Sequence, residues 1–224
     1  MSEAVILLAP HSEETIVVES MKFRLTYTGP LQSTQRDSVD GQRVPNAAHK
    51  HAIRREFHAQ LKRHWHINKA LKEAIAQPFD FGLGEGPVDW VPLKDVIARL
   101  YERNGYRFVP LVREEWYLQC SLDILFLRCD PPGSVLTGGD LDNRIKTLID
   151  ALRMPSNLQE LEGNQPQDGE DPFFCLLEDD KQVTALRVET DTLLGGSNFD
   201  PKHVHLVVNV EITPYHGTIF NAMF

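Results

Sequence analysis

Residues 116–129 constrain the fold of this chain more than any other segment. Their apolar side chains occupy alternate positions, which is typical of a β-strand with one buried face. In the second half of the segment, Leu125 and Leu127 make the opposite face apolar as well. This is the strongest strand signal in the chain, and it predicts a domain that is built around a β-sheet.

Other segments supply the remaining elements of such a domain. Three have the alternation or the composition of further strands: residues 21–27, 180–190 and 203–213. Three show the apolar spacing of helices: residues 46–77, 93–104 and 140–153. The first helix would begin at an Asn46 cap, and the second would end with Gly105 at its C′ position. This order of elements predicts an α+β fold, a mixed β-sheet with helices packed on one face.

Length and composition favour one domain in a reducing compartment. Residues 1–20 are expected to be an N-terminal extension, and residues 21–224 a single domain with insertions near 78–112 and 154–175. The segment 154–172 is predicted to be a flexible loop. No apolar run approaches the roughly 20 residues that span a membrane. The three cysteines form no CxxC pair, which favours a soluble, cytoplasmic protein.

The charged residues of the chain are segregated. The formal net charge of −9 argues mildly against a generic nucleic-acid binder, because such domains tend to be basic. Residues 49–72, however, contain seven Lys or Arg and one acid, whereas residues 156–180 contain eight acids and no Lys or Arg. Basic and histidine side chains of the first segment recur three or four positions apart, so they would line one face of a helix.

This basic stripe has two interpretations of about equal weight. The first is an ordinary solvated helix face. The second is a surface for a polyanion, because exposed helices usually mix charges of both signs and this one does not. On the second interpretation, the expected DNA-binding residues are Arg54, Arg55, Lys62, Arg63, Lys69 and, farther along the chain, Arg144.

Two short segments contain residues that are suited to metal chemistry. The first, GDLDNRIKTLIDAL at 139–152, is by itself more simply structural, because Asp140 suits a helix start and Asp142 with Lys146 is an ordinary i,i+4 pair. The second, LEDDKQV at 177–183, crowds three acids at the start of an apolar strand. Such crowding is destabilising unless a cation relieves it, and Mg²⁺ prefers carboxylate oxygens.

The two segments together, DLDNxxKxxxDAL followed by DDxQV, resemble the RusA family of Holliday junction resolvases. The order of strands and helices from residue 21 to about residue 213 is similar as well. The resemblance implies a RusA-like fold and an endodeoxyribonuclease that cleaves branched DNA as a homodimer. It also implies dependence on Mg²⁺, with Mn²⁺ as a substitute, and neither an organic cofactor nor a membrane.

Matched position by position, the resemblance places the catalytic residues at Asp140, Asp142, Lys146 and Asp180. The three acids would hold the metal, with Asp179 as a further ligand beside them. A metal-activated water would then attack the phosphodiester, and Lys146 would offset charge on the phosphate or on the leaving oxygen.

The chain departs from the compact members of that family. It has the extension and the two insertions, and acids follow Arg187 where the family tends to have lysine. Two alternatives therefore stay open: the same fold and site acting on another nucleic-acid structure, and a non-catalytic nucleic-acid-binding or interaction protein that kept the fold. A structural Ca²⁺ site is less favoured, because the acids lack EF-hand spacing.

Overall fold

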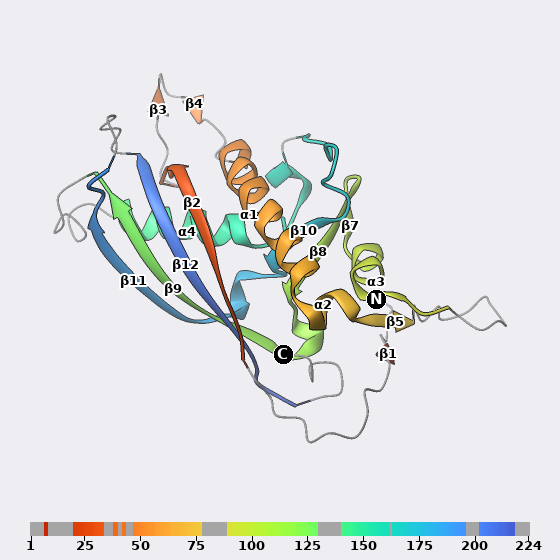
Figure 1. Cartoon of the computed structure of the whole chain (residues 1–224). Helices are drawn as coiled ribbons and strands as arrows, with labels where there is room; N and C mark the ends of the chain where they lie inside the picture. The colour runs from red at the N-terminus through yellow and green to blue at the C-terminus, as the bar shows by residue number, and fades with distance from the viewer. Residues whose placement is uncertain are drawn as a thin grey trace.

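The computed structural model describes residues 7–8, 20–33, 38–39, 42–43, 47–77, 89–129, 140–161, 163–195 and 202–217. A four-stranded sheet dominates this part of the chain (Figure 1). Its strands follow in the order β11 (Val183–Thr192), β9 (Leu118–Arg128), β12 (His203–Pro214) and β2 (Met21–Pro30). β11 runs parallel to β9, and β12 is antiparallel to both β9 and β2. The predicted mixed sheet within an α+β architecture is therefore confirmed.

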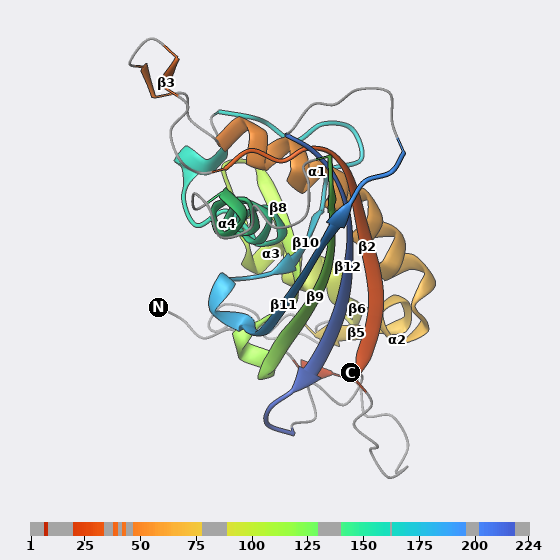
Figure 2. The same ribbon diagram turned by 90° about the vertical axis from the view of Figure 1, so that its left-hand side faces the viewer.

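Helices cover one face of this sheet. The long helix α1 (Ala47–Ile67) runs behind the strands in Figure 2, and α4 (Asp140–Leu152) lies beside β11. Along β9 and β12 alternate side chains are buried, and those between them are partly exposed. Ile124 and Val208, for example, are neighbours in the register and are both fully buried. This alternation explains why the sequence signal of the two strands was so clear.

A smaller sheet packs against α1. Its strands are β10 (Phe173–Leu177), β8 (Tyr106–Val112) and β7 (Glu102–Arg103), with β10 parallel to β8. The ring of Phe173 stacks on His58 of α1 at 4.3 Å between ring centroids, and Tyr106 meets the same phenyl ring edge-on. The sequence interpretation missed β8 and β10, because both are short apolar runs without alternation and lie largely within the segments taken as insertions.

Short elements complete the described part of the chain. The helical ones are α2 (Lys69–Glu73), α3 (Leu93–Leu100), η1 (Glu114–Trp116), η2 (Leu158–Leu161) and η3 (Asp180–Gln182). The extended ones are β1 (Leu7–Leu8), β3 (Ser38–Val39), β4 (Gln42–Arg43), β5 (Ile75–Gln77) and β6 (Val91–Pro92). β1 pairs with β5, so part of the expected N-terminal extension belongs to a sheet. None of the described helices is long and apolar enough to cross a membrane.

Two helix predictions are wrong at their C-terminal ends. The helix expected to reach residue 77 ends at Ile67, because Asn68 caps the short α2 by accepting a hydrogen bond from the Leu71 N–H at 3.1 Å. The helix expected to reach residue 104 ends at Leu100. Gly105, with φ of 77°, lies in the tight turn between β7 and β8 and does not cap a helix. The N-cap predicted at Asn46 lies outside the described residues.

Candidate active site

A groove of about 840 Å³ lies between α4 and the edge strand β11. Aliphatic side chains of both elements form much of its wall. The charged side chains that line it are Asp142, Lys146, Asp150, Asp180 and Lys181. The groove thus brings together the two segments that the sequence interpretation linked, although they are well separated along the chain.

Helix α4 places its charged residues by its amphipathic pattern. Leu148 and Leu152 are buried in the core, and Ile145 is nearly so. Asp142 and Lys146 are one turn apart and exposed, and both line the groove. The helix begins at Asp140, as predicted, but the side chain of Asp140 lies outside the described residues.

The second acidic segment forms a capped turn before β11, which begins at Val183 and not at residue 180 as predicted. The carboxylate of Asp179 accepts a hydrogen bond from the Lys181 N–H at 3.0 Å, and this bond holds the pKa of that carboxyl below its usual range. The Gln182 side chain accepts in return from the Asp179 N–H at 3.2 Å. Asp180 is exposed and lines the groove, whereas Asp179 serves as the cap.

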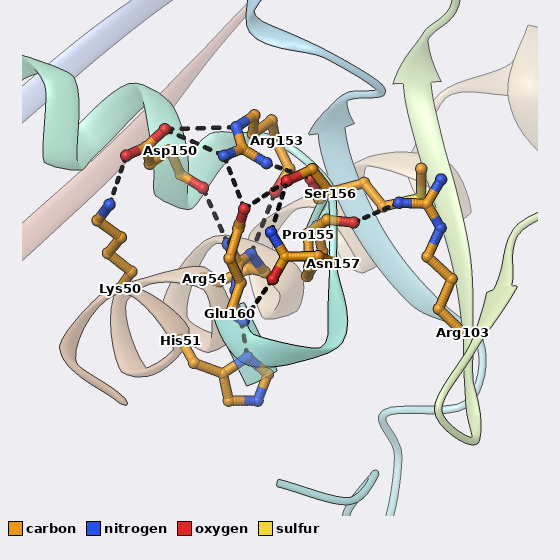
Figure 3. A network of polar contacts seen from close by, with 11 residues as sticks. Lys50, His51, Arg54, Arg103, Asp150, Arg153, Pro155, Ser156, Asn157 and Glu160 are labelled. Carbon is orange, nitrogen blue, oxygen red and sulfur yellow. Dashed lines mark hydrogen bonds and ion pairs between the residues drawn. The ribbon is translucent and has the colours of Figure 1, made fainter. Parts of the chain in front are cut away.

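The far end of α4 is tied to α1 and to the segment after α4 by a network of ion pairs (Figure 3). Lys50 of α1 reaches Asp150 at 2.5 Å, and Arg153 lies 3.3 Å from the same carboxylate. Arg153 also pairs with Glu160 at 3.0 Å. Burial by itself would lower the pKa of Arg153 and raise the pKa of Glu160. The bonds of the network outweigh burial, so the pKa of Arg153 is raised and that of Glu160 is lowered. The network fixes α4 and therefore one wall of the groove.

The charged side chains nearer the start of α4, Asp142 and Lys146, are not part of this ion-pair network. Within the described ranges, neither Asp142 nor Lys146 forms an ion pair or a side-chain hydrogen bond, so the predicted pairing between them is wrong for this structure. Asp142 and Asp180 offer carboxylate oxygens to an open groove, and Mg²⁺ suits such a set because it keeps several waters. The described residues contain no group of three or more acids, histidines or cysteines close enough to hold a metal, and that search does not cover Asp140.

The basic stripe of α1 does not form an open phosphate-binding face. Arg54 is 1% exposed, and its guanidinium donates to the carbonyls of Asp150 at 2.9 Å and Arg153 at 3.1 Å. His51 and His58 are buried as well. The prediction that Arg54 contacts DNA is therefore wrong for this conformation, because its hydrogen-bond donors face the interior.

The acidic segment 154–172 supplies partners for other residues of the stripe. Arg55 pairs with Glu170 at 2.7 Å, and Lys62 donates to the carbonyl of Gly169 at 2.6 Å. The segment predicted to be a flexible loop instead packs on α1, with Leu161 fully buried. The two segments of opposite charge thus face each other within the chain.

The other candidates for DNA binding differ in exposure. Arg144 is 7% exposed, so it is a poor candidate for a phosphate contact in this structure. Arg63 and Lys69 are exposed and stay candidates. In the folded protein, only a few of the basic side chains in residues 49–72 are therefore exposed and available to an outside ligand.

Three charged residues near the groove were missed as site residues. Asp150 and Lys181 line it, and Lys50 bonds to Asp150 across the helix contact. Asp150 is part of the DAL end of the first segment, so the sequence contained a signal for it. No sequence signal marked Lys50, because its contact with Asp150 depends on how α1 packs on α4.

Comparisons with protein-family models, with curated proteins and with solved structures find no match to this chain.

Proposed function

We propose that this protein is a Mg²⁺-dependent endonuclease of the RusA type that cleaves branched DNA, with Mn²⁺ able to replace Mg²⁺. The proposal rests on one observation: Asp142, Lys146 and Asp180, which come from two separate sequence segments, line the same groove. Asp142 and Lys146 share one face of α4, so the informative part of this observation is that Asp180, from the other segment, lines the same groove. Their exposure and the absence of ion-pair partners for Asp142 and Lys146 among the described residues support it.

Asp142 and Asp180, with Asp140 at the start of α4, are the residues that would hold the metal. Mg²⁺, when bound, supplies positive charge against the phosphate and a water of lowered pKa for attack on phosphorus. Lys146, one turn after Asp142, has no ion-pair partner among the described residues and would offer its ammonium to the phosphate or to the leaving oxygen. The ion pairs of Asp150 hold α4 in place, so these side chains need little rearrangement.

The substrate structure is a separate part of the proposal. The burial of Arg54 and the pairing of Arg55 leave α1 with less exposed basic surface than a long duplex contact would use. This favours keeping a second candidate, in which the same site cleaves another nucleic-acid structure. A panel of four-way junctions, flaps, single strands and RNA duplexes, each incubated with Mg²⁺ and the full-length protein, distinguishes the two.

The decisive experiment compares Asp142→Asn and Lys146→Ala with wild type on that panel. We expect both variants to abolish cleavage or slow it greatly, while circular dichroism stays unchanged. Asp142→Asn should also weaken Mn²⁺ binding measured without nucleic acid, whereas Lys146→Ala should not. Asp168→Asn and Lys72→Ala are matched controls, since both residues are exposed and neither lines the groove.

Two results would refute the proposal. Full activity in either variant would remove the assigned role of that residue. Absence of cleavage by wild type on every member of the panel would favour a non-catalytic protein that binds nucleic acid or another partner.

A further inference from the structure

Arg113, between β8 and η1, is a fully buried cation that does not line the groove. Its exposed fraction is 0%, and its guanidinium carbon lies 3.6 Å from the centroid of the Trp116 ring. The three guanidinium nitrogens meet no acceptor at good hydrogen-bond geometry within the part of the chain that the structure describes. A charge buried in this way is costly unless opposite charges nearby compensate it. The acids that surround Arg113 therefore indicate its role.

Two carboxylates provide this compensation. Glu115 approaches Arg113 at a long 3.8 Å, and Glu178 interacts electrostatically with the same guanidinium. Backbone bonds place Glu178 there, because its N–H donates to the Val112 carbonyl at 3.0 Å and its carboxylate accepts from the Glu114 N–H at 3.1 Å. The first acid of the LEDDKQV segment is thus bonded to the two residues that flank the buried cation.

The three consecutive acids of this segment consequently have different environments. Glu178 lies against the buried cation, where the Tyr101 hydroxyl also bonds to it. Asp179 caps the η3 turn, and Asp180 is exposed and lines the groove. Adjacent like charges repel one another, so three carboxylates on one turn need separate directions or separate partners. Compensation of Glu178 inside the protein leaves Asp180 as the acid that is directed to the groove.

We propose that Arg113 is a positioning residue of the groove: its buried charge holds the Glu178 carboxylate inward, and this anchors the η3 turn so that Asp180 faces the groove. An ion pair between Lys181 and Glu114 ties the turn to the same place. Arg113 does not line the groove, so it acts through Glu178. The inference deepens the proposed function and rests on it for the role of Asp180 as a metal ligand. The anchoring of the turn does not depend on that function.

The physical link between the cation and the turn is the cost of an uncompensated carboxylate. Without the charge of Arg113, Glu178 would keep its bonds to residues 112 and 114 only as a partly buried anion, which is unfavourable. Solvation of Glu178 would instead break these bonds and release the turn. A neutral glutamine at position 178 can accept from the same N–H and needs no cation.

Arg113→Met tests the anchor without metal or nucleic acid. Methionine keeps apolar contact with Trp116 but removes the charge. We expect the amides of residues 178–182 to lose protection at least about tenfold in native-state hydrogen exchange, whereas the amides of β12 keep theirs. In the double variant Arg113→Met with Glu178→Gln, protection of the turn should return to within about threefold of wild type.

Mn²⁺ affinity, titrated in the folded full-length protein without nucleic acid, connects the anchor to the groove. Arg113→Met should raise the Mn²⁺ dissociation constant at least about tenfold, and the double variant should recover most of this loss. Leu25→Ala is the matched control for a destabilising buried substitution, because β2 is the opposite edge strand of the sheet, and it should leave the constant unchanged. Tyr101→Phe removes one bond to Glu178 and no buried charge, so it should fold and raise the constant about threefold.

Several results would overturn the positioning role. They are wild-type protection of the turn or wild-type Mn²⁺ affinity in a folded Arg113→Met protein, and a double variant that recovers neither. If Arg113→Met does not fold, wild-type Mn²⁺ affinity in Tyr101→Phe has the same meaning.

Asp180→Asn separates this inference from the proposed function. If Asp180→Asn leaves Mn²⁺ affinity unchanged, the groove is not the metal site and the proposed function fails, while hydrogen exchange still decides whether Arg113 anchors the turn. If Asp180→Asn weakens Mn²⁺ binding and Arg113→Met does not, only the positioning role fails.

Discussion

Helices α1 and α4 both carry charged side chains at helical spacing, but the fold uses the two sets differently. On α1, Arg54 and Arg55 bond to α4 and to the segment after it. On α4, Asp142 and Lys146 point into an open groove, and no ion-pair partner for them occurs among the described residues. A charge that is already compensated inside the chain is a structural element, whereas an exposed and uncompensated one is available to a ligand. The difference gives the buried cations of α1 a structural role and makes Asp142 and Lys146 of α4 the stronger candidates for contact with a ligand.

The largest expected effect is on stability at Arg54. Replacing it with Met keeps most of the volume but leaves the buried carbonyls of Asp150 and Arg153 without their donors. We expect a loss of about 3–5 kcal/mol in the free energy of unfolding, because removal of one partner from a buried charged network is strongly destabilising. Urea denaturation measures the loss.

Arg63→Met on the exposed side of the same helix is the matched control. It should change the free energy of unfolding by less than about 0.5 kcal/mol. Equal effects of the two substitutions would contradict the division between buried and exposed cations of α1.

A second prediction concerns pH and the buried His51. Burial, and then the nearby Arg54 and Arg55, lower the pKa of His51 to about 4. The unfolded value is higher, near 6.5, so the unfolded state binds the proton first and stability falls as pH drops from about 6.5 towards 4. The loss attributable to this residue approaches about 3 kcal/mol at the acid end, at about 1.4 kcal/mol per pKa unit.

Unfolding measured by urea at a series of pH values tests this contribution. In His51→Phe, which keeps an aromatic ring beside Tyr106 and Phe173, the decline between pH 6.5 and 4 should be shallower than in wild type. The exposed His66, replaced by Gln, should leave the wild-type slope in place. An unchanged slope in His51→Phe would mean that other groups dominate the acid response.

The sequence located those strands and helices whose apolar residues recur with a clear period, and it missed those without one. Strands β9 and β12 alternate because one face is buried and the other partly exposed, so the sequence alone located them. Strand β10 is buried at every position, and a short continuous apolar run gives no period to recognise. The break after Ile67 depended on Asn68 acting as a cap within an otherwise helical pattern, which the spacing of apolar residues does not reveal.

The candidate site was predictable to a similar extent. The residue patterns around Asp142 and Asp180 did not by themselves show that the two segments meet, and that expectation came from the family resemblance; in the structure residues of both segments line the groove. The opposite charges of 49–72 and 156–180 were visible too, but the sequence interpretation weighed a solvated helix face against an external polyanion for the first segment and did not pair it with the second. Whether a basic helix meets DNA or an acidic segment of its own chain depends on tertiary packing, which charge patterns do not specify.

The smallest expected effects are on nucleic-acid affinity. They should differ between cations that are exposed and cations that already pair within the chain. Lys69 is exposed, so Lys69→Ala should remove at most one phosphate contact and lower the slope of log affinity against log salt by about 1. Arg55 pairs with Glu170 at 2.7 Å, so Arg55→Gln should leave that slope nearly unchanged and lower stability by about 1–2 kcal/mol. Fluorescence anisotropy of a labelled junction, measured over a series of salt concentrations, gives both slopes. If Arg55→Gln flattened the salt dependence as much as Lys69→Ala, the ion pair with Glu170 would have to open on binding, and α1 would regain the role that its sequence first indicated.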